Sequence, residues 1–308
     1  MKRAILSGAT GAIGLALIQE LIHNGIEVLV LCRKDSEKNK KIPENVLITK
    51  KICSLDQLSM LQNDTGKEYD IFYHLAWDGT FGLSRNNLKL QVKNIEFALD
   101  AVHAAKRFGC TSFIGIGSQA EYGPVETKLT ASTPVFPLDG YGMAKLCAGQ
   151  MTRLEANQLG LHHNWVRVLS VYGPNDGEKT LVMSLIKNLR MGIAPECTFG
   201  DQIWDYLFSE DAALALRLIG EKGVNGKVYV LGSGEAKPLK HYIKQIQELV
   251  SPFTEIKYGA IPYSRNQVMF LQADISELVN DTGFCPCYSF SSGIKEVFKS
   301  LKRGEMFS

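Results

Sequence analysis

The stretch Gly8-Ala9-Thr10-Gly11-Ala12-Ile13-Gly14 directly follows an apolar run at residues 4–7 and opens a segment whose apolar residues recur with helical spacing. It therefore predicts a turn from a strand into a helix. Glycines at this spacing let the main chain approach a pyrophosphate, whose charge the helix N-terminus then stabilises. The motif predicts a dinucleotide site, and a glycine-rich turn without a ligand is the alternative. The residues expected to contact the dinucleotide here are Gly8, Thr10, Gly11, Ala12, Ile13 and Gly14.

Strand-like and helical runs alternate through the first half of the chain. The strand-like runs are residues 4–7, 27–31, 46–49, 71–75, 112–117 and 164–170. The helical runs are best defined at residues 13–24, 88–108 and 140–159. This alternation predicts an α/β fold, a doubly wound parallel sheet of the Rossmann type with helices on both faces. Ligands of such sheets bind at the carboxyl ends of the strands.

The regular alternation of strand-like and helical runs ends after Pro174. Helical runs at residues 181–190, 210–219 and 239–249 and a strand-like run at residues 227–231 follow at less regular spacing. We therefore expect two parts of the chain. Residues 1–170 form the dinucleotide-binding Rossmann domain, with some later chain crossing back, and residues 171–308 form a smaller α/β substrate-binding lobe.

Charge and composition exclude several classes of protein. The 34 Lys and Arg residues nearly balance the 32 Asp and Glu residues, and no long run of one sign occurs. We therefore expect neither a nucleic acid nor a membrane surface as a partner. No segment has the length of a membrane span, and the N-terminal apolar run lacks the small-residue cleavage site of a signal peptide. We expect a cytoplasmic protein.

The cysteines are consistent with that compartment. The seven cysteines are odd in number and mostly scattered, as is usual for reduced thiols. Only Cys285 and Cys287 form a close pair, and no second pair or histidine cluster completes a zinc site. No bound metal is expected.

The end of the second strand-like run bears on which dinucleotide binds. An NAD-binding chain usually presents an acidic residue there for the ribose 2′-hydroxyl, whereas this chain has Cys32 followed by Arg33 and Lys34. The two cations can pair with a 2′-phosphate, a contact that arginine makes well. The alternative is a solvated basic loop, since a charged stretch continues to Lys41. Because the acid is missing, we expect NADP rather than NAD.

Three residues suggest the chemistry. Tyr141 and Lys145 lie four residues apart at a predicted helix start, so they share one helix face. A tyrosine has an ordinary pKa of about 10, which must fall by about three, roughly 4 kcal/mol, for acid/base work near neutral pH. A lysine ammonium and a positive nicotinamide ring are suitable sources of that field. Ser118, at the end of the fifth strand-like run, adds a hydroxyl that can hold a substrate carbonyl during hydride delivery.

With this set the chain resembles the extended short-chain dehydrogenase/reductases, specifically their nucleotide-sugar branch. The matches run nearly end to end. They comprise the glycine turn, His74-Leu75-Ala76, Asn94, Ser118 with Tyr122-Gly123, Tyr141 with Lys145, residues 167–174, residues 200–211, Gly283-Phe284 with Pro286, and Gly293-Ile294.

The resemblance implies roles for these residues. The catalytic residues would be Ser118, Tyr141 and Lys145, with Asn94 supporting the active-site helix. The cofactor contacts after the glycine turn would come from Leu75, Ala76, Tyr141 and Lys145, besides Arg33 and Lys34. His74 would be structural.

The chain departs from the family pattern on the substrate side. The family usually has arginine before an aspartate where this chain has Trp204-Asp205, and commonly asparagine in place of Ser170. Arg265 is a candidate for the missing phosphate contact, whereas Trp204 is equally compatible with a core position. Cys53 lies near the usual adenine-side aspartate. The expected substrate-binding residues are Ser118, Gln119, Ser170, Trp204 and Arg265.

The residues after Ser118 separate the reactions of the family. Its dehydratases carry Asp-Glu there and its 3,5-epimerase/reductases carry cysteine, whereas this chain has Gln119-Ala120. Its 4-epimerases carry the ribose-binding acid that is missing here. We therefore expect an NADPH-dependent reductase of a 4-keto-deoxy nucleotide sugar, most like the CDP-abequose and CDP-paratose synthase group, and a homodimer. The alternatives are an NAD-dependent nucleotide-sugar epimerase and a non-catalytic NADP-binding sensor.

Overall fold

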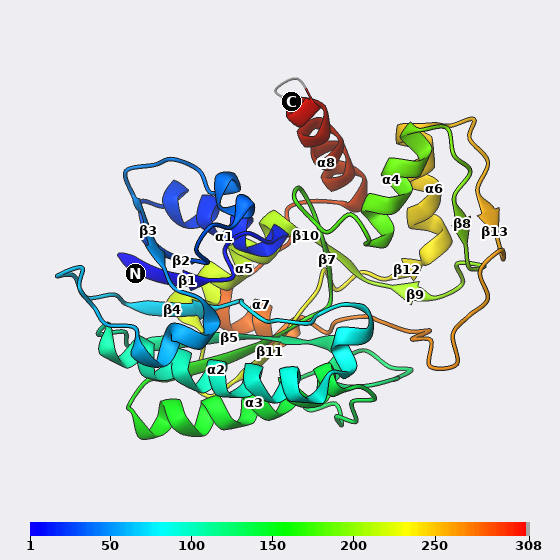
Figure 1. The fold of residues 1–308 in the computed structure, drawn as a ribbon. Helices are drawn as coiled ribbons and strands as arrows, with labels where there is room; N and C mark the ends of the chain where they lie inside the picture. Colours follow the sequence, from blue (N-terminus) through cyan, green and yellow to red (C-terminus); the bar gives the residue numbers. More distant parts are fainter. Residues whose placement is uncertain (306–308) are drawn as a thin grey trace.

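The computed structural model of the protein describes residues 1–305, with side chains up to residue 301. Within residues 1–305 the largest sheet has seven strands, all parallel, in the order β11-β6-β5-β4-β1-β2-β3 (Figure 1). Its strands are β1 (Arg3–Ser7), β2 (Glu27–Cys32), β3 (Ile48–Ile52), β4 (Ile71–His74), β5 (Ser112–Ser118), β6 (His162–Val168) and β11 (Val228–Leu231). The predicted doubly wound Rossmann sheet is confirmed.

Each central strand contributes to two hydrophobic cores because successive side chains of a strand point to opposite faces. In β1, Leu6 packs in one core and Ile5 in the other, and neither is exposed. Helices α1 (Ala12–His23) and α5 (Ser209–Lys222) cover the first face (Figure 1). Helices α2 (Leu88–Arg107) and α3 (Gly140–Gln158) lie side by side over the other.

A second hydrophobic cluster lies beside the sheet, on the right of Figure 1. It gathers α4 (Leu181–Arg190), α6 (Leu239–Val250) and α8 (Phe290–Glu305). In the described part of the chain, three two-stranded pairs lie outside the main sheet, and β8 with β13 is at the far right of Figure 1. Their strands are β7 (Ser170–Tyr172), β8 (Glu196–Cys197), β9 (Ile203–Trp204), β10 (Tyr206–Phe208), β12 (Lys237–Pro238) and β13 (Lys257–Tyr258). The chain after residue 170 thus alternates between the second cluster and the sheet, because β11, α5 and α7 (Ser276–Thr282) pack with the sheet.

Two predicted strands have different bounds in the structure. The run at residues 164–170 is interrupted, because β6 ends at Val168 and Ser170 begins β7, which pairs with β10 outside the main sheet. The third strand covers Ile48–Ile52 rather than residues 46–49, since its pairing with β2 begins at Ile48. It is an edge strand with exposed lysines, so its own apolar pattern marks its ends weakly.

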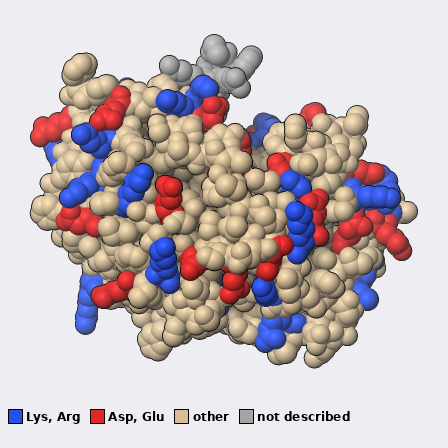
Figure 2. Space-filling model, turned by 180° about the vertical axis from the view of Figure 1, so that it is seen from behind, with Lys and Arg blue, Asp and Glu red and all other residues tan. Residues whose placement is uncertain are grey.

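Short 3-10 helices follow several strand ends and shape the edge where ligands bind in such sheets. They are η1 (Glu37–Lys41), η2 (Leu55–Met60), η3 (Gly82–Asn86) and η4 (Gln119–Glu121). On the face seen in Figure 2, basic and acidic side chains are interspersed over the surface. Over residues 1–305, no helix combines the length and apolar character that crossing a bilayer requires.

Candidate active site

The glycine turn packs tightly at two positions and is open at the third. A Cβ on Gly8, whose φ is +78°, would lie 2.5 Å from the amide nitrogen of Ala76. A Cβ on Gly14 would lie 2.5 Å from the carbonyl oxygen of Gly8, so these two glycines let α1 lie close to the ends of β1 and β4. A Cβ on Gly11 would meet no atom within 4 Å. Gly11 caps α1 without a side-chain hydrogen bond, which leaves the N-terminus of this helix facing open space.

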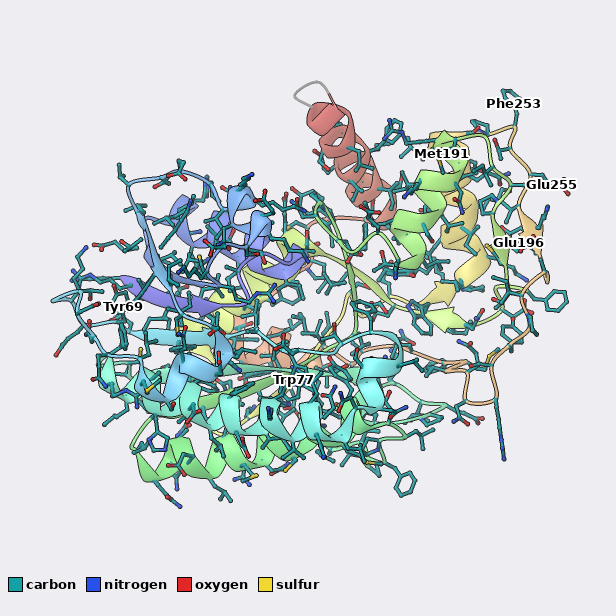
Figure 3. All side chains as sticks on the ribbon, viewed as in Figure 1. Tyr69, Trp77, Met191, Glu196, Phe253 and Glu255 are labelled. Atoms are coloured by element: carbon teal, nitrogen blue, oxygen red, sulfur yellow. The ribbon has the colours of Figure 1, made fainter. Side chains whose placement is uncertain are left out.

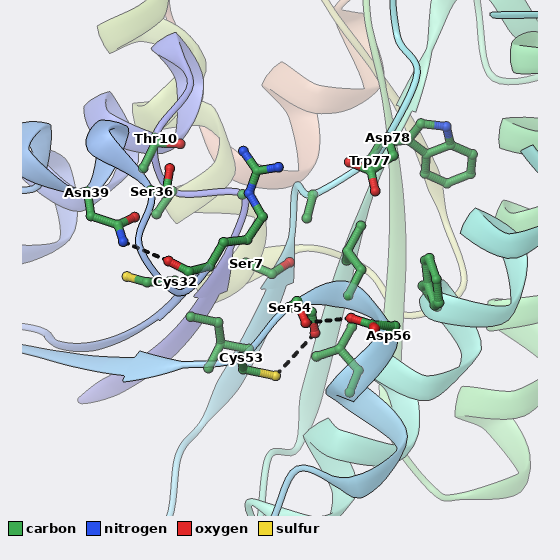
Figure 4. Close-up of a pocket in the computed structure, with 18 residues that line it drawn as sticks. Ser7, Thr10, Cys32, Ser36, Asn39, Cys53, Ser54, Asp56, Trp77 and Asp78 are labelled. Atoms are coloured by element: carbon green, nitrogen blue, oxygen red, sulfur yellow. Dashed lines mark hydrogen bonds between the residues drawn. The ribbon is translucent and has the colours of Figure 1, made fainter. Parts of the chain in front are cut away.

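A pocket of about 250 Å³ extends from this turn along the ends of β1, β2, β3 and β4 (Figure 4). The predicted cofactor residues that line it are Gly8, Thr10, Arg33 and Ala76. A pocket beside a free helix N-terminus at the strand ends is suited to a dinucleotide. Leu75 lies behind the pocket, where its amide nitrogen donates to the carbonyl oxygen of Ser7.

The basic end of this pocket lies after β2. Cys32 is buried, and Arg33, Ser36 and Asn39 line the pocket beside it. The Asn39 side chain donates to the carbonyl oxygen of Arg33 at 2.8 Å, which holds the loop in place. Lys34 is exposed and does not line this pocket, so the structure separates the two predicted cations.

The pocket also contains an acid that the sequence analysis missed. Asp56, in η2 after β3, lines it together with Cys53 and Ser54, and the Ser54 hydroxyl donates to its carboxylate (Figure 4). Asp56 follows Cys53, the position near which the family usually has an aspartate, with only two residues between them. That short spacing is the signal in the sequence by which Asp56 could have been found.

The structure brings Ser118, Tyr141 and Lys145 together at the ends of β5 and α3. Ser118 is the last residue of β5, and its hydroxyl hydrogen-bonds with Tyr141, the second residue of α3. The side chain of Asp139 caps α3 by accepting from the amide of Gly142 at 2.7 Å. Lys145 is only 4% exposed, and its Nζ donates to the carbonyl oxygen of Ile116 at 2.6 Å.

Burial dominates the electrostatics of the tyrosine. It raises the pKa of Tyr141 above the ordinary value, while the hydrogen bond with Ser118 and the positive charge of Arg85 act in the opposite direction. The Arg85 guanidinium lies 4.3 Å from the centre of the Tyr141 ring and pairs with Asp139 at 2.7 Å. The tyrosine hydroxyl is therefore protonated at neutral pH. It is suited to donate a proton to an oxygen held by Ser118.

Trp77 is a second residue that the sequence analysis missed. It lies near the middle of the molecule (Figure 3), lines the dinucleotide pocket, and its ring centre is 3.8 Å from the Nζ of Lys145. The indole meets the Tyr141 ring edge-on at 6.2 Å and donates to Gln91 at 2.9 Å. Its position directly after the His74-Leu75-Ala76 motif was the available signal. Trp77 thus joins the wall of the pocket to the catalytic side chains.

Asn94 and His74 support the strand end from behind. Asn94 is buried in α2, where its side chain accepts from the amide of Asp78 at 3.0 Å and donates to the carbonyl of Asp78 at 2.9 Å. It thereby fixes the loop that carries Trp77. His74 is buried, its Nδ1 is 2.9 Å from the Ser7 hydroxyl, and burial lowers its pKa to about 3. His74 is therefore neutral at physiological pH.

With this geometry in place, known sequences identify the family. The sequence model of the NAD dependent epimerase/dehydratase family matches residues 4–232. The chain belongs to this family. The predicted resemblance to the extended short-chain dehydrogenase/reductases is confirmed, and the protein is an enzyme of this family.

Relatives within the family perform different reactions. The chain is 26% identical to the CDP-abequose synthase of Salmonella typhimurium, covering 96% of this chain and 97% of the synthase. It is 22% identical to the dTDP-glucose 4,6-dehydratase of Neisseria meningitidis, over 96% and 92% of the two chains. The solved UDP-glucose 4-epimerase of Thermotoga maritima, with UDP-glucose, has the same fold, with a TM-score of 0.87, 21% identity and coverage of 98% and 99%. The family and fold therefore leave the reaction open.

On the substrate side, Ser170 and Trp204 are the two residues that depart from the family pattern, and their side chains contact each other. The indole Nε1 of Trp204 donates to the Ser170 hydroxyl at 2.7 Å, so the positions where the family usually has arginine and asparagine form one pair. Trp204 is half-buried. The neighbouring Asp205 is fully buried and accepts from the loop at Ser233 and Gly234, which gives it a structural role.

A second pocket, of about 230 Å³, is lined by Gln119, which is a predicted substrate residue, and by Asn266, which follows the predicted residue Arg265. Gln119 lines it with Arg85, Asn86 and Asn266, next to the catalytic end of β5. Arg265 is exposed and directly precedes Asn266. The predicted substrate residues therefore lie in two groups, Ser118 with Gln119 and Ser170 with Trp204.

Among residues 1–305, no three His, Cys, Asp or Glu side chains gather as a metal site. Cys285 and Cys287 are both exposed free thiols.

Proposed function

We propose that the protein is an NADPH-dependent reductase of a 4-keto-deoxy sugar carried on a nucleoside diphosphate. The observation that carries the proposal is the complete catalytic set with a protonated Tyr141 beside Ser118, followed by Gln119-Ala120 instead of an acid pair. Amide and methyl side chains have no proton-abstracting function, so dehydration has no base at this place. The similarity to a CDP-abequose synthase along nearly the whole chain supports the same reading.

In this reaction each residue has a distinct role. NADPH supplies a hydride to the carbonyl carbon of the sugar. The Ser118 hydroxyl donates a hydrogen bond to the carbonyl oxygen, and Tyr141 transfers its proton to that oxygen as the alkoxide forms. Lys145 stabilises the resulting tyrosinate until solvent returns the proton. The products are the sugar alcohol and NADP⁺, so protons and electrons balance.

We propose NADP rather than NAD on the basis of the pocket after β2. Arg33 and the polar side chains of Ser36 and Asn39 line the wall beside Cys32, where an NAD enzyme usually presents its ribose-binding acid. A guanidinium is well suited to a 2′-phosphate. The acid in this pocket, Asp56, follows β3 and not β2, and it lies near the position of the family's usual adenine-side aspartate.

We further propose that residues 1–170, with the returning segments β11, α5 and α7, bind the dinucleotide, and that the cluster of α4, α6 and α8 belongs to the substrate lobe. In this arrangement Ser170, Trp204 and Arg265 face the nucleotide part of the substrate, and Gln119 faces the sugar.

The test is a consumption assay. Enzyme is mixed with NADPH and a freshly prepared 4-keto-6-deoxy nucleotide sugar, carried in parallel on CDP, UDP, GDP and dTDP. Stoichiometric loss of the reduced-nicotinamide absorbance with at least one of these substrates supports the reductase. Isomerisation of a nucleotide sugar without net consumption, with NAD released on denaturation, establishes the epimerase instead. Binding of NADPH with no turnover of any substrate supports a non-catalytic NADP-binding sensor.

A further inference from the structure

A buried carboxylate lies directly beneath the catalytic end of β5. Glu121, the last residue of η4, has no exposed surface, and both of its oxygens are hydrogen-bonded. One oxygen accepts from the amide of Ser118 at 2.8 Å and from the indole nitrogen of Trp165 at 3.0 Å. The other accepts from Nε of Arg167 at 2.7 Å. A side chain three residues after Ser118 thus holds the main chain of the catalytic serine.

The space for this carboxylate is kept by a glycine. A Cβ on Gly117 would lie 2.4 Å from the Glu121 oxygen and 2.3 Å from the Trp165 nitrogen. Arg167 is only 3% exposed, and its guanidinium also lies 4.6 Å from the Tyr122 ring centre. Burying an ion pair costs desolvation energy that its attraction often fails to recover, so stability alone is a weak reason for one here. The pair is better explained by what it does to its neighbours.

The neighbour that needs a negative charge is Lys145, whose Nζ lies 6.0 Å from the centre of the Trp165 ring that donates to Glu121. Its Nζ is held by two uncharged partners, the carbonyl oxygen of Ile116 and the ring of Trp77. Burial lowers the pKa of Lys145 to about 7, and the charge of Glu121 acts in the opposite direction. Without that charge the buried ammonium would lose its proton more readily.

The other titratable groups around Lys145 do not supply this charge. His74 on β4 is neutral, since burial lowers its pKa to about 3, and Tyr141 on α3 is protonated, since burial raises its pKa. Arg167 on β6 is positive and paired with Glu121. On the far side of the tyrosine ring, Arg85 of η3 is paired with Asp139.

We propose that Glu121 is a positioning residue with two roles: it fixes the main chain of Ser118 and keeps Lys145 protonated. The catalytic consequence rests on the proposed function, because it requires Ser118 and Lys145 to act in hydride transfer. Both physical roles exist in the protein without substrate, so they can be tested independently of the reaction.

Two variants separate the roles. Glu121→Gln removes the charge and keeps the size, whereas Glu121→Asp keeps the charge and withdraws the carboxylate from the Ser118 amide. The full chain is labelled with ¹³Cε-lysine and titrated by NMR without cofactor or substrate. The Lys145 signal is the one absent from Lys145→Met. Hydrogen exchange at the Ser118 amide is measured on the same samples, and thermal unfolding reports whether each variant is folded.

In the unsubstituted protein the Lys145 signal should titrate near pH 7. In Glu121→Gln the midpoint should fall by about one pH unit, a tenfold change in proton affinity. In Glu121→Asp it should stay close to the parent value while the Ser118 amide exchanges faster. If Glu121→Gln does not fold, Glu121→Gln/Arg167→Gln removes both buried charges and should show a smaller downward shift, because loss of the Arg167 charge acts in the opposite direction.

The results decide each role separately. An unchanged Lys145 midpoint in a folded variant lacking the carboxylate overturns the electrostatic role. Unchanged exchange at Ser118 in Glu121→Asp overturns the main-chain role. If the enzyme proves to be a reductase, the pH profile of hydride transfer should shift in the same direction as the lysine midpoint in Glu121→Gln. Failure of reductase activity leaves the NMR result standing, so the two proposals fail independently.

Discussion

At the scale of the residue, Tyr141 is the proposed proton donor. The hydroxyl hydrogen-bonds with Ser118, while burial keeps it protonated. Tyr141→Phe removes the proton and leaves the ring that packs against Trp77. We expect NADPH affinity to change little and turnover to fall by a factor of about 10² or more, the scale of a positioned acid. Steady-state rates and NADPH titration of both proteins check this, and unchanged turnover would remove Tyr141 from the mechanism.

Arg33 and Lys34 make a matched pair for the cofactor preference. Arg33 lines the dinucleotide pocket and Lys34 does not. We expect the protein to bind NADPH at least about tenfold more tightly than NADH, about 1.4 kcal/mol. Arg33→Ala should remove most of this preference with little effect on NADH, and Lys34→Ala should retain it. Calorimetric titration of the three proteins with both cofactors measures the affinities; equal affinities for NADPH and NADH in the unsubstituted protein contradict the assignment.

Lys145 also makes stability depend on pH. Burial lowers its pKa to about 7 in the folded protein, against about 10.4 in an unfolded chain. Between these values the unfolded chain binds the extra proton, so stability rises with pH, by at most about 1.4 kcal/mol per pH unit. Below pH 7 both forms are charged and this gain is absent. Relative to Lys145→Met, the free energy of unfolding of the protein should therefore increase from pH 7 to 10, as measured by urea titration. A constant difference would contradict a lowered pKa of the buried lysine.

At the scale of the element, we expect two glycines of the turn to differ in role, with Gly14 needed for packing and Gly11 for binding. A Cβ on Gly14 would lie 2.5 Å from the Gly8 carbonyl oxygen, whereas a Cβ on Gly11 meets nothing within 4 Å. Gly14→Ala should cost roughly 1–3 kcal/mol of stability through overpacking. Gly11→Ala should stay within about 1 kcal/mol of the parent, the range of a cap substitution. It should nevertheless weaken NADPH binding by about tenfold or more, because the methyl group occupies the space proposed for the pyrophosphate.

Urea unfolding and NADPH titration of the two glycine variants provide the check. Normal NADPH affinity in a folded Gly11→Ala protein would place the pyrophosphate elsewhere. Unchanged stability in Gly14→Ala would show that α1 can move away from β1 at no cost.

At the scale of the whole molecule, α2 and α3 present an apolar surface. Both helices lie on the outside of the sheet, at the bottom of Figure 1. Exposed apolar side chains recur along them at helical spacing. They are Leu88, Val92, Met143, Met151 and Leu154. We propose that a second copy of the chain covers this surface, since two such helix pairs can pack as a four-helix bundle.

Leu154→Glu tests the proposed dimer, because Leu154 is 56% exposed and its replacement leaves the core intact. Light scattering after size exclusion should show a dimer for the unsubstituted protein and a monomer for the variant. Leu83→Glu is a control, since Leu83 is 96% exposed and lies outside both helices. A monomeric parent protein, or a Leu154→Glu variant that remains dimeric, would contradict the proposed surface.

The sequence alone determined the fold and predicted that Ser118, Tyr141 and Lys145 lie together, because both depend on local patterns. Strand and helix periods specify the sheet, and the glycine turn marks where α1 begins. The spacing of Tyr141 and Lys145 specifies a shared helix face that the structure reproduces. The third strand was placed less well, since none of its residues is fully buried and its apolar residues do not alternate with polar ones.

The tertiary structure decided the rest, because distant segments meet only after folding. Glu121 and Trp77 each contact a partner on another element, and Asp56 lines a pocket with residues from other strand ends, so the sequence around each residue says little about these contacts. The pairing of Trp204 with Ser170 joins two strands that are 34 residues apart. Burial then sets the charges: it keeps Tyr141 protonated and lowers the pKa of Lys145 to about 7, an effect of desolvation that no spacing of residues encodes.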